Sequence, residues 1–178
     1  MSRKWRSFGL ALLGVVLVDQ LSKRWARAEL DPFEVVPVLG SFLGLTRLDS
    51  SGSSFGVLGE LDPILLGGIL GVGVILVGSL LWRADGADGF AGTALGLILG
   101  GALGNGVDRF YLREITDFVR FDLRLFMIPP FNLADTGVAL GAGLLLLDIA
   151  ASEASEAAME PSMEPVVEES LRAPEDPR

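Results

Sequence analysis

Four long apolar segments restrict what this chain can fold into. They cover approximately residues 5–25, 63–82, 90–109 and 131–151. The length of each is close to the roughly 20 residues that a helix needs to cross a bilayer. Half of all residues are hydrophobic and the mean hydropathy is +0.50. The sequence therefore predicts a mainly α-helical integral membrane protein, a bundle of four transmembrane helices.

The connections after the first and third segments have a different character. In residues 30–62, apolar residues are mixed with Pro37, Gly40 and Gly44, which favours short strands over a helix. In residues 115–127, apolar and charged residues alternate from Val119 onward, which is typical of a half-buried strand that Asp117 immediately precedes. We expect a small β-rich region on one face of the membrane.

The C-terminal segment, residues 152–178, carries much of the chain's net charge of −9. It holds eight acidic and two basic residues, and it is rich in Pro, Glu, Ser and Ala. Such a composition has little to bury and predicts a disordered, solvated tail. The chain thus divides into a membrane-embedded domain, residues 1–151, and an acidic tail, residues 152–178.

Glycines recur every fourth residue in the third segment and in parts of the second and fourth. They lie at Gly67 and Gly71, at Gly92, Gly96, Gly100 and Gly104, and at Gly137 and Gly141. This spacing places small residues along one face of a helix, where another helix approaches closely. We predict a compact bundle.

Cysteine and histidine are absent from the sequence. Their absence excludes disulfides, thiol nucleophiles, Ser-His-Asp triads and Cys/His zinc sites. Chemistry in this chain must use carboxylates, hydroxyls, lysine or amides, and we expect no cofactor, no metal and no nucleic acid partner.

In a four-span topology, polar residues of the chain gather at one membrane face. The ends of spans one and three and the start of span four lie on the same side, together with the loop that contains Gly52. The polar residues placed there are Asp19, Asn105, Asp108, Arg109, Asp117, Asn132 and Asp135. An ionisable group in a bilayer costs roughly 2.5–3.5 kcal/mol, so such a cluster predicts a functional site. Asp148 falls on the other side and is interpreted as an ordinary interfacial charge.

A simpler interpretation of Asp135 is structural. A negative charge in the first turn of a helix stabilises the helix by about 0.3–1 kcal/mol.

The orientation of the chain in the membrane is open, since the N-terminus can lie on the cytoplasmic or on the outer side. A cytoplasmic N-terminus would place more Lys and Arg residues outside than inside, against the positive-inside rule.

Five motifs together resemble those of the lipoprotein signal peptidases, the signal peptidase II family. They are DQLSK at 19–23, the glycine loop that ends in Phe55, GNGVDR at 104–109, ITDF at 115–118 and FNLAD at 131–135. They occur in order within residues 5–151, and their combination is far more specific than any one of them.

The resemblance implies an aspartic endopeptidase of the bacterial inner membrane that removes signal peptides on the amino side of a diacylglyceryl-modified cysteine. It implies Asp117 and Asp135 as the catalytic pair, an active site at the extracytoplasmic face and cytoplasmic termini. Lipidated prolipoproteins and membrane lipids are the implied partners, and we expect a monomer.

Motif positions also imply supporting residues for substrate or for the catalytic pair. These are Asp19, Lys23, Ser50, Gly52, Asn105, Asp108, Arg109 and Asn132. Structural capping or interfacial anchoring is the alternative role for these residues except Ser50 and Gly52, whose loop could instead be a flexible surface turn. Ser50 is a departure, since the family typically has asparagine there, and a hydroxyl has a shorter reach than an amide and lacks its paired donor and acceptor groups.

Two close carboxylates can hydrolyse a peptide without any other catalytic group. Like-charge proximity separates their titrations, so that the pair shares one proton and activates a water. Which aspartate carries the proton stays open at this point.

Two rival interpretations use the same residues differently. A serine/lysine peptidase would pair Ser22 with Lys23, but adjacent residues on a helix point about 100° apart. A small transporter or proton-coupled membrane protein would relay charge through Asp19, Asp117 and Asp135. Clustering of these acids on one face argues against such a relay.

Overall fold

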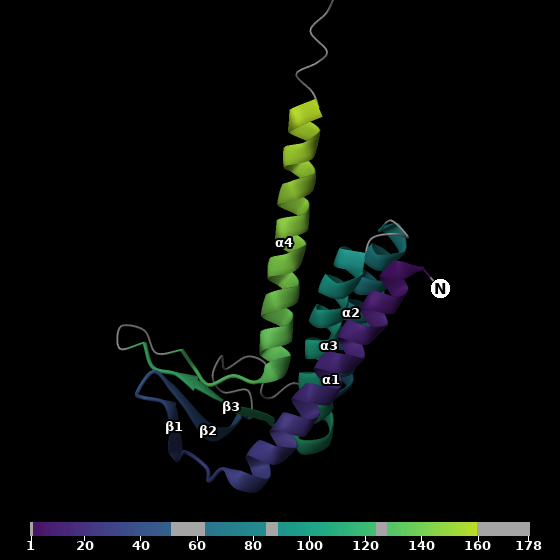
Figure 1. The fold of residues 1–178 in the computed structure, drawn as a ribbon. Helices are drawn as coiled ribbons and strands as arrows, with labels where there is room; N and C mark the ends of the chain where they lie inside the picture. Colours follow the sequence, from purple (N-terminus) through teal and green to yellow (C-terminus); the bar gives the residue numbers. More distant parts are fainter. Residues whose placement is uncertain (1, 51–62, 85–88, 124–127, 160–178) are drawn as a thin grey trace, which may run out of the picture. The chain divides into compact units, whose positions relative to one another are not determined.

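The computed structural model describes residues 2–50, 63–84, 89–123 and 128–159. Within these ranges the chain forms four helices and three strands in the order α1, β1, β2, α2, α3, β3, α4 (Figure 1). The chain divides into two units, residues 1–145 and residues 146–178. All the elements except the C-terminal part of α4 belong to the first unit, which also contains every predicted site residue.

The four helices fall on the four apolar segments. Their bounds are Arg3–Glu29 for α1, Pro63–Arg83 for α2, Gly89–Leu112 for α3 and Leu133–Met159 for α4. Two helical stretches among the described residues are long and apolar enough to cross a membrane, Gly89–Leu112 and Leu133–Ser155. The apolar stretch of α2 is shorter, Gly67–Arg83.

α1 and α3 pack closely along most of their length (Figure 1). The cause is the row of glycines on α3. A Cβ atom at Gly92 would clash with the main-chain oxygen of Lys4, and one at Gly96 would clash with that of Phe8. The glycine spacing therefore predicted this contact correctly, because only a residue without a side chain lets two helix backbones come this close.

The same prediction was wrong for α2. A Cβ at Gly67 or Gly71 would meet no described atom within 4 Å. α2 instead contacts the bundle through larger side chains, with Val77 and Leu81 in a cluster that also contains Leu95 and Leu99 of α3. These leucines and valines bury more apolar surface than glycines do, and they determine which face of α2 turns inward.

The strands β1, Val35–Leu39, β2, Leu43–Ser50, and β3, Ile115–Phe121, form an antiparallel sheet in that order. β3 therefore begins earlier than the predicted alternation from Val119. Asp117 lies within it, opposite Leu48, and not before it. The buried residues Thr116 and Phe118 alternate with less buried neighbours. The alternation of side chains that is typical of a strand therefore continues through Asp117.

The sheet is attached at one face and at one edge. On the face, Phe118 packs in a cluster with Ala26 and Leu30 from the end of α1. At the free edge of β3, Val119 exchanges two main-chain hydrogen bonds with Phe131, of 2.8 and 3.0 Å. β3 is thereby held between β2 and the residues that lead into α4.

α4 continues past the expected end of the fourth apolar segment. The helix reaches Met159, whereas the boundary of the tail was predicted at residue 151. Residues 152–159 are mostly Ala and Glu, which are strong helix formers and allow the helix to continue without a core to pack on. The rest of the predicted tail, residues 160–178, lies outside the described residues, as do residues 51–62 with Gly52.

Candidate active site

The site is built around the first turn of α4. Asn132 precedes the helix, and its side-chain oxygen accepts a hydrogen bond from the N–H of Asp135 at 3.0 Å. The carboxylate of Asp135 accepts one from the N–H of Asn132 at 3.1 Å. This reciprocal pair is a capping box, which satisfies main-chain donors that a helix start leaves free. It starts the helix at Leu133, two residues after the predicted start at Phe131, and fixes Asp135 within the first turn.

Asp117 approaches this turn from β3. The side-chain amide of Asn132 donates to Oδ1 of Asp117 at 2.7 Å, so this fully buried asparagine contacts both carboxylates. Ser50, at the end of β2, places its hydroxyl oxygen 3.0 Å from Oδ2 of Asp117 and 3.3 Å from the main-chain oxygen of Ile115.

The surroundings of Asp117 favour its protonated form. Burial raises the pKa of Asp117 to about 6, and the charge of Asp135 acts in the same direction. The hydrogen bonds from Ser50 and Asn132 and the charge of Lys23 oppose the shift without cancelling it. The charge of Asp135 therefore acts on the titration of Asp117, as expected for two carboxylates that lie close together.

Behind Asp135 lies a buried cation. Lys23 of α1 is fully buried, with its Nζ 2.8 Å from Asp19 and 3.0 Å from Asp108. Its third contact is a hydrogen bond of 2.7 Å to the side-chain oxygen of Asn105. The amide nitrogen of Asn105 in turn donates to Oδ1 of Asp135 at 2.8 Å. The chain Lys23–Asn105–Asp135 thus connects α1, α3 and α4.

The same network supports the helix that carries Asp135. Oδ1 of Asp19 accepts the main-chain N–H of Ala134 at 2.9 Å, another donor of the first turn of α4. The amide of Gln20 reaches Asp108 at 3.0 Å and the main-chain oxygen of Gly104 at 3.1 Å. Asp19 and Asp108 are each paired with Lys23, as a buried ion requires.

Eight of the predicted site residues that the structure describes lie in this cluster or at its edge. They are Asp19, Lys23, Ser50, Asn105, Asp108, Asp117, Asn132 and Asp135. Arg109 lies half-buried on α3, one turn after Asn105. Gly52 lies outside the described residues. No group of three acidic side chains in the described ranges is placed to hold a metal ion.

A second polar cluster was missed by the sequence analysis. Arg27 donates to the hydroxyl of Thr116 at 3.0 Å, and that hydroxyl donates to Asp49 at 3.0 Å. Asp49 also pairs with Arg47 at 2.7 Å. Thr116 and Asp49 each precede a residue of the site, Asp117 and Ser50, so this cluster ties both to the end of α1. Gln20 was also missed, although it lies inside the DQLSK motif.

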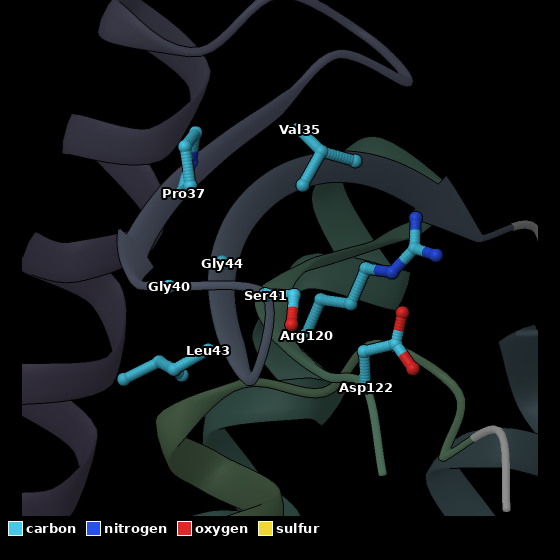
Figure 2. A pocket seen from close by; sticks show the side chains of 8 residues that line it. All are labelled: Val35, Pro37, Gly40, Ser41, Leu43, Gly44, Arg120 and Asp122. Carbon is cyan, nitrogen blue, oxygen red and sulfur yellow. The ribbon is translucent and has the colours of Figure 1, made fainter. Parts of the chain in front are cut away.

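One cavity of about 300 Å³ lies on the sheet (Figure 2). It is lined by Val35, Pro37, Gly40, Ser41, Leu43, Gly44, Arg120 and Asp122. No residue of the carboxylate pair or its supporting network takes part in it. The cavity is therefore separate from the candidate active site.

The fold is shared with membrane enzymes of known structure. A bacterial membrane enzyme solved by the in meso method at 1.9 Å resolution matches 80% of this chain and 91% of its own, with a TM-score of 0.73 and 25% identity. A second, solved at 2.3 Å resolution, matches 93% of this chain and 99% of its own, with a TM-score of 0.77 and 23% identity.

Sequence comparison defines the class further. The family described as signal peptidase (SPase) II matches residues 11–151. The lipoprotein signal peptidase of Geobacter sulfurreducens is 32% identical over 161 residues, 88% of this chain and 99% of its own length. That of Moorella thermoacetica is 38% identical over 136 residues, 76% of this chain and 87% of its own. The chain belongs to the signal peptidase II family, proteases of lipoprotein processing.

Proposed function

We propose that this protein is an aspartic endopeptidase that removes signal peptides from diacylglyceryl-modified prolipoproteins, with Asp117 and Asp135 as its catalytic residues. The observation that carries the proposal is the placement of Asn132, whose side chain and main chain bind one carboxylate each. Family membership supplies the reaction class, and the paired carboxylates supply the chemistry.

The reaction needs a water molecule between the two carboxylates. An ionised carboxylate accepts a proton from this water as its oxygen attacks the scissile carbonyl carbon, and a protonated carboxyl group donates to the carbonyl oxygen. The tetrahedral intermediate then collapses with cleavage of the C–N bond, and the amine that leaves takes a proton from the pair. No thiol, imidazole or metal is needed, which suits a chain without cysteine or histidine.

We place all four helices in the bacterial inner membrane, with cytoplasmic termini and the site at the extracytoplasmic face. The excess of basic residues on the site side opposed this orientation under the positive-inside rule. Three of them are engaged within the protein: Lys23 with Asp19 and Asp108, Arg27 with Thr116, and Arg47 with Asp49. Such side chains contribute less to the charge bias than solvated ones.

The proposed site also bears on the domain boundary. We assign the peptidase domain to residues 1–151, because the described partners of Asp117 and Asp135 all lie within this range. Substrates are lipidated precursors, with the scissile bond on the amino side of the modified cysteine. We expect the enzyme to work as a monomer.

A cleavage assay in vesicles tests the function. The purified enzyme is given a lipidated prolipoprotein and its unlipidated form, and only the first should be cut. Asp117→Asn and Asp135→Asn should each abolish cleavage while folding is retained, and Asp148→Asn, outside the site, should cleave normally. Cleavage by either of the first two variants would refute the pair, and equal cleavage of both substrates would refute the substrate class.

A further inference from the structure

A side-chain contact joins β2 to β3 on the face of the sheet opposite Asp117. Asp49 of β2 and Thr116 of β3 are direct partners in the antiparallel register, and the hydroxyl of Thr116 donates to Oδ1 of Asp49 at 3.0 Å. Successive side chains of a strand point to opposite faces, so this contact lies on one face and Asp117 on the other. We term the contact between Asp49 and Thr116 the strand link.

The strand link is held by charged partners on both sides. Thr116 is fully buried, and its hydroxyl accepts from Nη1 of Arg27 at 3.0 Å while it donates to Asp49. A hydroxyl has one hydrogen and two lone pairs, so both contacts are satisfied together. Arg47 binds the other carboxylate oxygen, Oδ2 of Asp49, at 2.7 Å. These contacts fix the side chains of Asp49 and Thr116 relative to each other.

Arg27 connects the strand link to the helix that also supports Asp135. It lies on the same face of α1 as Lys23, four residues earlier, since residues four apart are neighbours on a helix. Lys23 reaches Asp135 through Asn105, whereas Arg27 reaches the residue that precedes Asp117. One face of α1 therefore supports both carboxylates.

On the other face of the sheet, the same two strands hold Ser50 against Asp117. The hydroxyl of Ser50 donates to Oδ2 of Asp117 at 3.0 Å. Burial raises the pKa of Asp117, and the hydrogen bond from Ser50 is the largest of the effects that lower it. A serine hydroxyl lies only one bond beyond Cβ, so it makes this contact only while β2 and β3 keep their spacing at this point.

From these contacts we propose that Thr116 and Asp49, anchored to α1 by Arg27, are positioning residues for cleavage. The strand link fixes the spacing of β2 and β3 where Ser50 donates to Asp117, and it thereby holds the Asp117 carboxylate in the orientation that the reaction needs. This inference rests on the proposed function and adds residues that act through Ser50. Thr116 has no exposed surface with which to contact a substrate.

Steady-state kinetics with a lipidated precursor in mixed micelles test the inference. Thr116→Val preserves the shape of the side chain and removes the hydroxyl, so both of its contacts are lost. We expect kcat to fall by about tenfold or more, since a small misplacement of a catalytic group can cost roughly 100-fold. KM should be unchanged, because the strand link does not touch the substrate. An unchanged kcat in folded Thr116→Val would overturn the inference.

Two variants are matched to this change. Thr116→Ser retains the hydroxyl and should retain the kcat of the parent. Thr46→Val removes the hydroxyl of another buried threonine of β2, one that pairs with β1, and it should also retain the kcat of the parent. If either variant loses as much activity as Thr116→Val, the strand link is not the cause of the loss and the inference fails.

A double-mutant cycle shows whether Thr116 acts through Ser50. Ser50→Ala removes the donor to Asp117 and should lower kcat by itself, and a parental kcat in this variant would contradict the inference. In the Ser50→Ala background there is no Ser50 contact left to hold. Thr116→Val should therefore cost much less in that background than in the parent. Equal fold losses in the two backgrounds would refute the inference, because independent effects multiply.

Asp49→Ala tests the strand link from β2. The side chain of Asp49 is partly exposed, so this variant is informative even if Thr116→Val does not fold. It should lower kcat and leave KM unchanged, as expected for an interaction that is needed only in the transition state. A lower Tm with unchanged kcat and KM is the signature of a purely structural role and would overturn the proposal.

These outcomes are separable from the failure of the proposed function. If Asp117→Asn or Asp135→Asn still cleaves, the catalytic pair itself is wrong. If both are inactive while Thr116→Val and Asp49→Ala cleave like the parent, the pair stands and only the role of the strand link fails.

Discussion

Replacing Lys23 by methionine should destabilise the protein more than any single surface change. The ammonium group makes three contacts of 2.7, 2.8 and 3.0 Å and has no solvent exposure. Methionine preserves most of the volume and removes every contact. Asp19 then keeps the Ala134 N–H and Gln20, whereas Asp108 keeps Gln20 among its described partners.

The size of the effect follows from the burial of both partners. Removing one member of a buried ion pair costs about 3–5 kcal/mol, because the remaining charge is left without compensation. Protein stabilities are typically about 5–15 kcal/mol, so this is a large fraction of the total. For a chain of this length, a loss of that size corresponds to a fall in Tm on the order of 10 °C.

Thermal unfolding in detergent, followed by circular dichroism or by aggregation, measures the change. Arg24→Met is the matched control, since Arg24 is the exposed neighbour on the same helix, and its Tm should change little. The double variant Lys23→Met with Asp108→Asn should recover part of the loss, because it removes one of the two stranded charges. A Tm for Lys23→Met within about 2 °C of the parent would show that the three contacts do not stabilise the fold.

Two further predictions concern packing and pH. Gly96→Leu should lower the Tm, since its Cβ would lie 2.5 Å from the main-chain oxygen of Phe8 and overpacking costs about 1–3 kcal/mol or more. Gly67→Leu is the control and should leave the Tm unchanged, because a Cβ at Gly67 meets no described atom within 4 Å. Equal losses of Tm in the two variants would contradict the packing argument. Asp117 binds its proton more tightly in the folded state, with a pKa raised from 3.8 to about 6, so stability should fall as the pH rises from about 4 to about 6. Asp117→Asn should remove that part of the pH dependence in unfolding experiments, and an unchanged slope would contradict it.

The helical core of the fold follows from sequence because its signals are local. Apolar length locates the helices, and the capping box can be recognised in Asn132 and Asp135, three residues apart. The position of Asp117 within β3 could not be predicted in the same way. Its strand is extended towards Ile115 by pairing with Ser50 and Asp49, residues more than sixty positions earlier in the chain.

The partners of Lys23 show the same limit more sharply. Asp19 lies four residues earlier and can be paired from helix periodicity alone. Asn105 and Asp108 are on another helix, so their contact with Lys23 depends on the rotation of α3 against α1. The sequence gives the glycine face of α3 that sets this rotation, but the failure of the same argument for Gly67 shows that spacing alone does not decide which face is packed.

Close packing and the buried charges depend on each other at Gly104. A Cβ there would lie 2.7 Å from a carboxylate oxygen of Asp19 and 3.3 Å from the Cβ of Ala134. The absence of a side chain lets Asp19 sit between α3 and the start of α4, where it binds Lys23 and the N–H of Ala134. Without this space, Lys23 would lose the partner that holds it beside Asn105. Gly104, the first glycine of the GNGVDR motif, is therefore needed for the ion pair of Asp19 and Lys23 as much as for the packing of the helices.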